Sequence, residues 1–403
     1  MILDTNRFIS EKITGRPESF FQTDLSQNRE ALQKAIAGKK ALVIGGAGTI
    51  GSSFIKALVP YQPHSLVVAD INENGLTELT RDLRSTEGLQ LPLQYLTYPI
   101  NFNSSVFKKI LKAHGPFDIV ANFAAHKHVR SEKDIFSIEA MVENNTLNAK
   151  YLLDLLKQNP PEHFFCVSTD KAANPVNIMG ATKKIMEDVI MAYSAEMKIS
   201  TARFANVAFS NGSLPAGFIE RIMKLQPLSA PSDVKRYFVS PAESGQLCLL
   251  ACILGQTGEV FFPKLGEENM TTFSAIAVDF LASLGYEADQ CESEDEARKK
   301  ASELTHKSKK YPVYFFQSDT SGEKSFEEFY TENEQVDFNR FHALGVITNT
   351  HRKSIASIEK LFNSIRQAFE RPDTTKIALV SLLKDYLPNF GHIETGKSLD
   401  QKM

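Results

Sequence analysis

The 403-residue chain contains no tryptophan and only four cysteines, at positions 166, 248, 252 and 291. So few cysteines cannot form a disulfide framework, so we expect a reducing compartment, the cytoplasm. An excess of basic residues is also missing, because 45 Lys and Arg face 48 Asp and Glu, for a formal net charge of -3. This balance argues against a nucleic-acid partner, since general polyanion binders carry a clear basic excess.

Long apolar runs are absent as well. The longest, residues 247–254, is far shorter than the roughly 20 residues that a membrane helix needs. The opening segment MILDTNRFISEK lacks the basic-then-apolar layout of a signal peptide. With 42% hydrophobic and 23% charged residues, the composition is that of an ordinary globular protein. These absences favour a cytoplasmic enzyme with a small-molecule substrate and no membrane partner.

From Lys40 onward, short apolar segments alternate with helical ones. Helices are expected, for example, over 52–58 and 145–157, where apolar residues recur at helical spacing. Apolar strands separated by helices are typical of a parallel sheet covered on both faces. The sequence therefore predicts an α/β fold with a doubly wound parallel sheet of the Rossmann type. Its expected strands are 41–45, 65–70, 94–100, 118–125, 163–169 and 200–207.

The two ends of the chain read as helical. Residues 26–37 predict a helix that Gly38 ends. From Lys353 an amphipathic helix is expected up to Pro372, then a second one, capped by Asp373 or Thr374, that runs to Leu387. The charged stretch 287–310 predicts a solvated helix and loop.

These patterns divide the chain into four parts. They are an N-terminal arm and helix (1–39), a Rossmann domain (40–209), a substrate-binding region that partly returns to the Rossmann sheet (210–347) and a C-terminal helical extension (348–403).

Residues 45–51 read GGAGTIG, follow a strand and open a helix. Glycines there let the backbone turn sharply and approach a pyrophosphate, while the helix N-terminus offers free N–H groups to that anion. Asp70 closes the next strand, 19 residues after Gly51. An acid at this place binds both ribose hydroxyls and repels a 2′-phosphate, so the motif favours NAD over NADP. The expected cofactor contacts in this part of the chain are Gly45, Gly48, Thr49, Ile50, Gly51 and Asp70.

The fifth strand ends in Thr169, Asp170 and Lys171. In doubly wound folds, ligands lie beyond the carboxyl ends of the strands, so these residues are expected to face the reactive end of the cofactor. The carboxyl group can protonate a leaving hydroxyl. A desolvated lysine ammonium with a lowered pKa can lose its proton, and the resulting amine can act as a base. The alternative is a surface Asp–Lys pair without chemistry.

Several segments carry a family resemblance: GGAGTIG, NFAAHKHV at 122–129, STDKAANPVNIMGATKK at 168–184, ARFANV at 202–207 with SNGS at 210–213, KRYF at 235–238 and SGEK at 321–324. With GRPESFF at 15–21, they occur in an order similar to that of the nucleotide-sugar 4,6-dehydratases of polysaccharide biosynthesis. These enzymes are extended short-chain dehydrogenase/reductases. The resemblance implies NAD as the cofactor and, as substrate, a UDP-linked N-acetylhexosamine such as UDP-N-acetylglucosamine.

The resemblance also implies a reaction. NAD+ takes the C4 hydride, Lys171 removes the C5 proton, Asp170 protonates the leaving C6 hydroxyl, and the hydride returns to C6 to give a 4-keto-6-deoxy sugar. Thr169 resembles the residue that contacts the 4-OH, and Lys183 the one that binds the nicotinamide ribose.

One position departs from the superfamily, whose usual Tyr-x-x-x-Lys has methionine here, at Met179. A thioether cannot accept a proton, so the 4-OH proton has to leave through Asp170 or through a water held by Thr169. Other branches of the dehydratases also carry methionine there, which favours retention at C5 by analogy.

The remaining matches are binding residues. Ala124 and Ala125 resemble cofactor contacts. Arg236 resembles a diphosphate clamp, because its guanidinium pairs two phosphate oxygens at once. No metal is expected, since the histidines beside Lys127 have no third ligand near them in sequence. The expected substrate contacts are Lys127, His128, Asn206, Ser213, Arg236, Glu323 and Lys324.

Two alternatives stay open: an NDP-sugar 4-epimerase on the same scaffold, and an NAD-binding partner protein without turnover. The choice between a UDP and a GDP sugar, and the C4 configuration of the hexosamine, also stay open. A homo-oligomer is expected from the resemblance.

Overall fold

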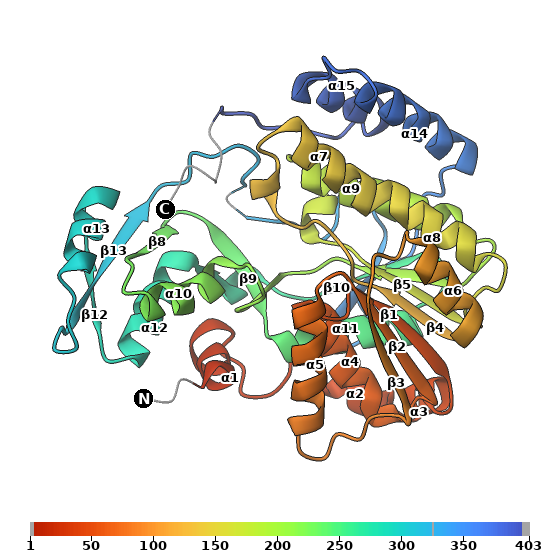
Figure 1. The fold of residues 1–403 in the computed structure, drawn as a ribbon, viewed down its shortest axis with the longest axis horizontal. Helices are drawn as coiled ribbons and strands as arrows, with labels where there is room; N and C mark the ends of the chain where they lie inside the picture. The colour runs from red at the N-terminus through yellow and green to blue at the C-terminus, as the bar shows by residue number, and fades with distance from the viewer. Residues whose placement is uncertain (1–3, 325, 397–403) are drawn as a thin grey trace.

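The computed structural model describes residues 4–324 and 326–396 (Figure 1). Residues 1–3 of the expected arm and 397–403 of the expected C-terminal extension lie outside the described residues. In Figure 1 a large sheet with its helices fills the right of the molecule, and a smaller lobe built around β8 (Leu228–Pro231), β12 (Glu287–Gln290) and β13 (Lys310–Phe316) lies on the left.

Nine strands of the described residues form the large sheet, in the order β14-β15-β10-β6-β5-β4-β1-β2-β3. The seven from β10 to β3 pair in parallel, whereas β15 is antiparallel to β10, and β14 to β15. The predicted doubly wound parallel sheet is confirmed. The strands are β1 (Lys40–Ile44), β2 (Ser65–Asp70), β3 (Gln94–Pro99), β4 (Ile119–Asn122), β5 (His163–Val167), β6 (Ile199–Ala202), β10 (Glu259–Pro263), β14 (Val336–Asp337) and β15 (Leu344–Ile347).

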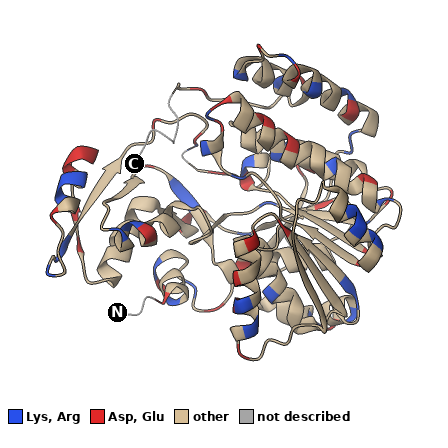
Figure 2. Ribbon diagram, in the orientation of Figure 1, with Lys and Arg blue, Asp and Glu red and all other residues tan. Residues whose placement is uncertain are grey.

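Helices cover both faces of this sheet (Figure 1). On one face α11 packs against α4, and Gly245 brings the two backbones so close that a Cβ there would lie 2.1 Å from the Ser53 carbonyl oxygen. On the other face α8 packs against α9. Charged residues lie mainly on helices and loops, and the strands carry few (Figure 2). The helices are α4 (Thr49–Leu58), α5 (Glu73–Ser85), α6 (Ser105–His114), α7 (Ile135–Val142), α8 (Asn148–Leu156), α9 (Ile178–Ala192) and α11 (Pro241–Leu254).

The expected strand 200–207 is wrong in its second half. The chain leaves the large sheet after Ala202, and Asn206–Val207 form β7, which pairs with β9 in a separate small sheet. The buried Arg203 follows β6 directly, and its guanidinium binds outside the sheet. This break in the strand places Asn206 beside the smaller lobe.

The smaller lobe contains a parallel sheet, β12-β13-β8, packed on two helices. The charged stretch 287–310 forms a strand as well as the expected helix, because Glu287–Gln290 pair with β13. The elements are β8 (Leu228–Pro231), β9 (Lys235–Val239), β11 (Met270–Thr272), β12 (Glu287–Gln290), β13 (Lys310–Phe316), α10 (Leu214–Met223), α12 (Phe273–Ser283) and α13 (Glu294–Ser302).

The N-terminal arm connects both lobes. Phe8, at the end of α1 (Thr5–Phe8), packs its ring 5.7 Å from that of Phe280 in the core of the smaller lobe. Arg16 then binds Glu243 of α11 at 2.8 Å. The expected helix 26–37 divides into α2 (Gln22–Gln27) and α3 (Arg29–Ile36).

Two helices close the described chain, α14 (Ile355–Phe369) and α15 (Lys376–Tyr386). They lie over α8 and α9 (Figure 1), and Lys150 of α8 binds Glu359 of α14 at 2.6 Å. The cap of α15 is Thr375, not Asp373 or Thr374, because the Thr375 side chain accepts the Ala378 N–H. Among residues 4–324 and 326–396, no helix has both the length and the apolar character needed to cross a membrane.

Candidate active site

The glycine-rich loop joins β1 to α4 at the carboxyl edge of the sheet. Gly45 has φ +74°, and a Cβ on it would lie 2.5 Å from the backbone nitrogen of Ala124. A Cβ on Gly51 would lie 2.3 Å from the Gly45 carbonyl oxygen. At Gly48 the nearest atom would be 3.5 Å away, so this residue leaves space before the N-terminus of α4. Two glycines therefore permit close packing, and the third leaves room for an anion.

Asp70 ends β2 beside this loop. One of its carboxylate oxygens accepts the Ala47 N–H and the other accepts the Asn72 N–H, both at 2.9 Å. Thr49, the first residue of α4, accepts the Asn211 N–H at 2.9 Å. The acid, the loop and the helix N-terminus thus lie together, and this donor set fits NAD.

Asp170, which is buried, and Lys171, whose side chain is 17% exposed, form an ion pair after the end of β5. Asp170 is 4% exposed, and its Oδ1 accepts from Thr169 Oγ1 at 2.8 Å and from Lys171 Nζ at 3.1 Å. Lys171 Nζ also lies 3.4 Å from Oε1 of Glu327. The structure brings the three predicted residues together, which excludes a surface pair.

The expected lowered pKa of Lys171 is wrong in this structure. Burial alone would lower it, but the charges of Asp170 and Glu327 outweigh burial, and the pKa of Lys171 is raised. Lys171 therefore rests as an ammonium and must lose a proton before it can act as a base.

Met179 and Lys183 lie on α9, four residues apart and therefore on one helix face. A Cβ on Gly180 would lie 2.6 Å from the Lys171 carbonyl oxygen, so α9 packs closely on the segment with Asp170. Lys183 Nζ donates to the Val167 carbonyl at 2.6 Å, and burial lowers the pKa of its ammonium. Met179 is 3% exposed, and its N–H donates to Glu132.

Arg236 lies on β9, nearly buried. Its Nη2 is 3.5 Å from Oε1 of Glu323, and its Nη1 donates to the Lys324 carbonyl at 2.9 Å. The structure therefore brings together three residues that sequence analysis expects at the substrate. Ser318 and Thr320 donate to the same Glu323 carboxylate.

The other expected residues are more dispersed. Ala124 and Ala125 follow β4 and are partly buried, whereas Lys127 and His128 are exposed. A Cβ on Gly212 would lie 3.0 Å from His128 Nε2, so this histidine touches the loop after β7. Ser213 caps α10, accepting the Ala216 N–H at 3.3 Å.

Asn145 holds the loop after β4. Its Oδ1 accepts the His126 N–H at 2.8 Å, and its Nδ2 donates to the His126 carbonyl and to Thr182 Oγ1. This side chain therefore fixes the backbone that carries Ala124 and Ala125 to α9.

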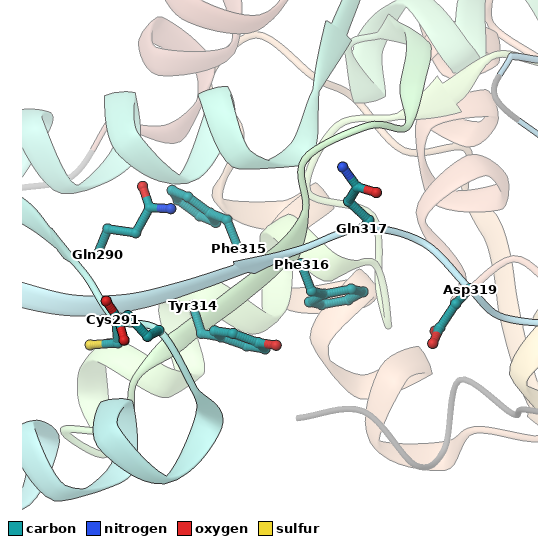
Figure 3. Close-up of a pocket in the computed structure, with 8 residues that line it drawn as sticks. Gln290, Cys291, Tyr314, Phe315, Phe316, Gln317 and Asp319 are labelled. Carbon is teal, nitrogen blue, oxygen red and sulfur yellow. The ribbon is translucent and has the colours of Figure 1, made fainter.

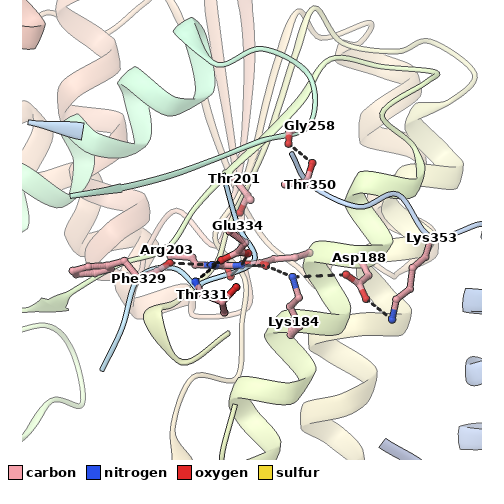
Figure 4. Close-up of polar contacts among 12 residues, drawn as sticks. Lys184, Asp188, Thr201, Arg203, Gly258, Phe329, Thr331, Glu334, Thr350 and Lys353 are labelled. Carbon is pink, nitrogen blue, oxygen red and sulfur yellow. Dashed lines mark hydrogen bonds and ion pairs between the residues drawn. The ribbon is translucent and has the colours of Figure 1, made fainter. Parts of the chain in front are cut away.

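Sequence reasoning missed an ion network centred on Arg203 (Figure 4). Arg203 binds Glu187 of α9 at 2.9 Å and Glu334 at 2.7 Å, and it donates to the Phe329 carbonyl. Ser168, directly before Thr169, donates to Glu187 at 2.7 Å. An arginine directly after an apolar strand was the available signal, because a buried guanidinium requires acidic partners.

A groove of about 730 Å³ on the smaller lobe shares no residue with the expected site. Figure 3 shows Tyr314 and Phe316 on one side of β13, and Phe315 and Gln317 on the other. The Tyr314 and Phe316 rings are stacked with centroids 6.1 Å apart. Among residues 4–324 and 326–396, no group of three His, Cys, Asp or Glu side chains could hold a metal ion.

A family model described as polysaccharide biosynthesis protein matches residues 41–348 of this chain. An uncharacterized membrane protein of Methanocaldococcus jannaschii is 33% identical over 264 residues, 63% of this chain and 75% of that protein.

Two bacterial relatives carry more informative names. The probable polysaccharide biosynthesis protein EpsC of Bacillus subtilis is 29% identical over 261 residues, 64% of this chain but 42% of EpsC, so the chain spans about two fifths of that relative. The UDP-N-acetylglucosamine 4,6-dehydratase (inverting) of Campylobacter jejuni is 24% identical over 245 residues, 59% of this chain and 70% of that enzyme.

Solved structures share the fold. Pen from Bacillus thuringiensis matches with a TM-score of 0.62 at 20% identity, over 82% of this chain and 98% of Pen. The dTDP-glucose 4,6-dehydratase DesIV of Streptomyces venezuelae, with NAD and DAU bound, has a TM-score of 0.55 at 18% identity, over 82% and 97% of the chains. A UDP-N-acetylglucosamine 4-epimerase from Methanobrevibacter ruminantium has 0.54 at 15% identity, over 83% and 99%.

Proposed function

This chain belongs to the polysaccharide biosynthesis protein family, among the nucleotide-sugar dehydratases and epimerases of the extended short-chain dehydrogenase/reductase superfamily, and from this we propose a specific reaction. The enzyme carries out the NAD-dependent 4,6-dehydration of a UDP-linked N-acetylhexosamine, with UDP-N-acetylglucosamine as the substrate. The product is the 4-keto-6-deoxy sugar.

The observation that carries this proposal is the buried contact between Asp170 and Lys171. A 4-epimerase needs only to move the C4 hydride and the 4-OH proton away and back, whereas an elimination also needs a base at C5 and an acid at C6. The pair lies at the carboxyl edge of the sheet, where doubly wound folds bind ligands. The same edge carries the glycine-rich loop.

NAD, when bound, supplies the oxidising and reducing equivalents of the cycle. Gly48 and the N-terminus of α4 would hold its pyrophosphate, Asp70 the ribose hydroxyls and Lys183 the nicotinamide ribose.

The chain's own residues move the protons. Lys171 removes the C5 proton once its ammonium has been neutralised, and Asp170 protonates the C6 hydroxyl as it leaves. Lys171 then gives a proton back to C5 as the hydride returns to C6. Thr169 Oγ1, already bound to Asp170, holds the 4-OH so that its proton passes to that carboxylate or to a water. Met179 cannot take this proton, because a thioether is not a base. Since other dehydratases with methionine at this position favour retention by analogy, we propose that the configuration at C5 is retained. Arg236 binds the diphosphate, a group that its planar guanidinium suits.

The test is a product analysis of the purified chain with UDP-N-acetylglucosamine. We expect a product lighter by one water, with no net reduction of NAD. An unchanged substrate mass would contradict the proposal, and NMR of the product in heavy water reports the stereochemistry at C5. Lys171→Ala is expected to abolish product formation. Activity in the wild type that this variant lacks would exclude the hypothesis of a partner protein without turnover.

A 4-epimerase is the second candidate, because the chain shares its fold with the Methanobrevibacter epimerase as closely as with DesIV. Asp170→Asn and the mass of the product together separate the two candidates. A dehydratase loses at least about a hundredfold in kcat, since removal of a general acid costs on the order of 10²–10⁴. An epimerase whose 4-OH proton leaves through a water held by Thr169 is expected to keep most of its activity. If Asp170 takes that proton, both activities fall, and the product mass, lower by one water only for the dehydratase, separates the two candidates.

A cytoplasmic location and a homo-oligomer remain part of this proposal. All four cysteines are free and buried, in keeping with a reducing compartment.

A further inference from the structure

Glu327 is an acid in the Asp170–Lys171 cluster that neither the sequence analysis nor the proposed mechanism uses. Its side chain is about 2% exposed, and its Oε1 lies 3.4 Å from Lys171 Nζ. Its second oxygen, Oε2, is buried and has no hydrogen-bond partner within the described part of the chain. A carboxylate oxygen in that state is costly, because burial without a partner penalises the charged form.

The two carboxylates on Lys171 differ in their surroundings. Asp170 Oδ1 accepts three hydrogen bonds, from Thr169 Oγ1, from the Lys171 N–H and from Lys171 Nζ. Glu327 lacks them at Oε2, and burial raises its pKa even though the Lys171 charge counteracts it. Glu327 Oε2 is therefore an oxygen on which a proton can rest without breaking a hydrogen bond.

The other charged groups beside this cluster have acidic partners of their own. Arg236 lies 3.5 Å from Glu323, and Lys324 lies 3.8 Å from Glu328. Both cations face Glu327 and lower the pKa of its carboxyl, and Arg236 also faces Lys171.

The segment that carries Glu327 is held in place by Arg203. Arg203 donates to the Phe329 carbonyl at 2.9 Å and binds Glu334 at 2.7 Å. Because Arg203 also binds Glu187, which accepts from Ser168, the same network fixes the chain directly before Thr169. The distance between Lys171 and Glu327 is thus set by a buried frame.

We propose that Glu327 is a positioning residue that holds the Lys171 ammonium at rest and accepts its proton when the nucleotide sugar is bound. In this step an N–H bond at Lys171 Nζ breaks and an O–H bond at Glu327 forms, so an ion pair becomes a neutral pair and no other reactant is needed. Exclusion of water by the sugar favours the neutral pair, because separated charges are costly in a dry site. The free amine can then take the C5 proton. When Lys171 has given a proton back to C5, Glu327 returns its own proton to Lys171 and the ion pair forms again.

This inference rests on the proposed dehydration, and the pH dependence of kcat tests it separately. Wild-type kcat is expected to be nearly flat between pH 6.5 and 8.5, since the proton moves within the protein. In Glu327→Gln the proton must leave to solvent, so kcat at pH 7 falls by about a hundredfold and then rises by about tenfold per pH unit. The KM for UDP-N-acetylglucosamine should change by less than about threefold, because Glu327 acts through Lys171.

Two further variants make the test decisive. Glu327→Asp keeps a carboxylate, so its kcat is lower but still flat with pH; a sloping profile would overturn the inference, even if Glu327→Gln failed to fold. Glu328→Gln is the matched control, since that side chain is 47% exposed and binds Asn174 at 2.8 Å. It should retain the wild-type profile.

The outcomes separate the two proposals. A wild-type chain that releases no dehydrated sugar contradicts the proposed function. An active wild type combined with a Glu327→Gln kcat that is unchanged, or lowered by one factor at every pH, contradicts only the role of Glu327.

Discussion

Gly45 and Gly48 belong to one loop but are needed for different reasons. Gly45 adopts φ +74°, and its missing Cβ permits contact with the backbone after β4. Gly48 has φ -73°, which any residue can adopt, and open space around its Cβ position. At position 45, the backbone conformation and the close packing both require glycine. At position 48, glycine is required only because a side chain would fill the space of a ligand.

We therefore expect two distinct phenotypes. Gly45→Ala should lower the free energy of unfolding by about 2 kcal/mol or more, since strain at positive φ and a backbone clash add. Gly48→Ala should unfold like the wild type but bind NAD about tenfold more weakly or worse. Thermal unfolding and NAD titration measure both effects, and a strongly destabilised Gly48→Ala would contradict this division.

Glu187 makes stability depend on pH. Burial alone would raise the pKa of Glu187, but Arg203, Lys184 and Ser168 lower it from 4.5 to about 2. Because the folded-state pKa is depressed, the stabilisation is complete above pH 4.5 and is lost as the pH falls from 4.5 toward 2. It amounts to about 3 kcal/mol, at 1.36 kcal/mol for each pH unit.

Unfolding in urea at pH 7, 5, 4 and 3 tests this dependence. Glu187→Gln should be less stable than the wild type at pH 7, and the difference should shrink as the pH falls. Glu78→Gln is the control, because that side chain is 72% exposed. Parallel curves for wild type and Glu187→Gln would contradict the prediction.

At the scale of the elements, the segment 388–396 after α15 forms hydrogen bonds with two separate loops. The Gly391 and Ile393 N–H groups donate to the carbonyls of Pro175 and Val176, just before α9. Thr395 Oγ1 donates to the Asp319 carbonyl, and Ser321 donates to Glu394. The segment therefore connects the loop before Met179 with the loop that carries Glu323 and Lys324.

Removal of one backbone donor tests this connection. Ile393→Pro lacks the N–H that binds Val176 at 3.0 Å, and we expect about a tenfold loss in kcat/KM as the loop before α9 loosens. Ile393→Ala retains the N–H and loses a side chain that is already 40% exposed, so it should remain near wild type. Equal kinetics for the two variants would show that the backbone contact does not support the site.

At the scale of the whole molecule, the C-terminal helices bear on assembly. α14 and α15 lie over α8 and α9, joined by the Lys150–Glu359 pair and by buried apolar residues such as Ile358 and Phe362 (Figure 1). The exposed surface of α8 and α9 is therefore reduced within one chain. A homo-oligomer has to use a surface that these helices leave open.

The molecular mass of the protein in solution tests the predicted homo-oligomer. Light scattering is expected to give a mass of at least twice the 44.9 kDa of one chain. A mass of 44.9 kDa at all concentrations would remove the prediction.

The sequence by itself determined those features whose partners lie close together in the chain. The apolar strands, the glycine-rich loop followed by Asp70, and the adjacent Asp170 and Lys171 are such local patterns, and backbone geometry translates each into a structure. The C-terminal helices followed likewise from their apolar spacing.

Only the tertiary structure decided the charge of Lys171 and the surroundings of Asp170. Glu327, Arg203 and Glu334 come from distant parts of the chain, and Phe8 of the arm packs on Phe280 of the smaller lobe. Their effect depends on burial and on distances of about 3–4 Å between charges, which vary steeply with how remote segments pack. The spacing of residues in the sequence reports neither burial nor these distances. The contact between the Glu327 carboxylate and the Lys171 ammonium therefore became visible only in the folded chain.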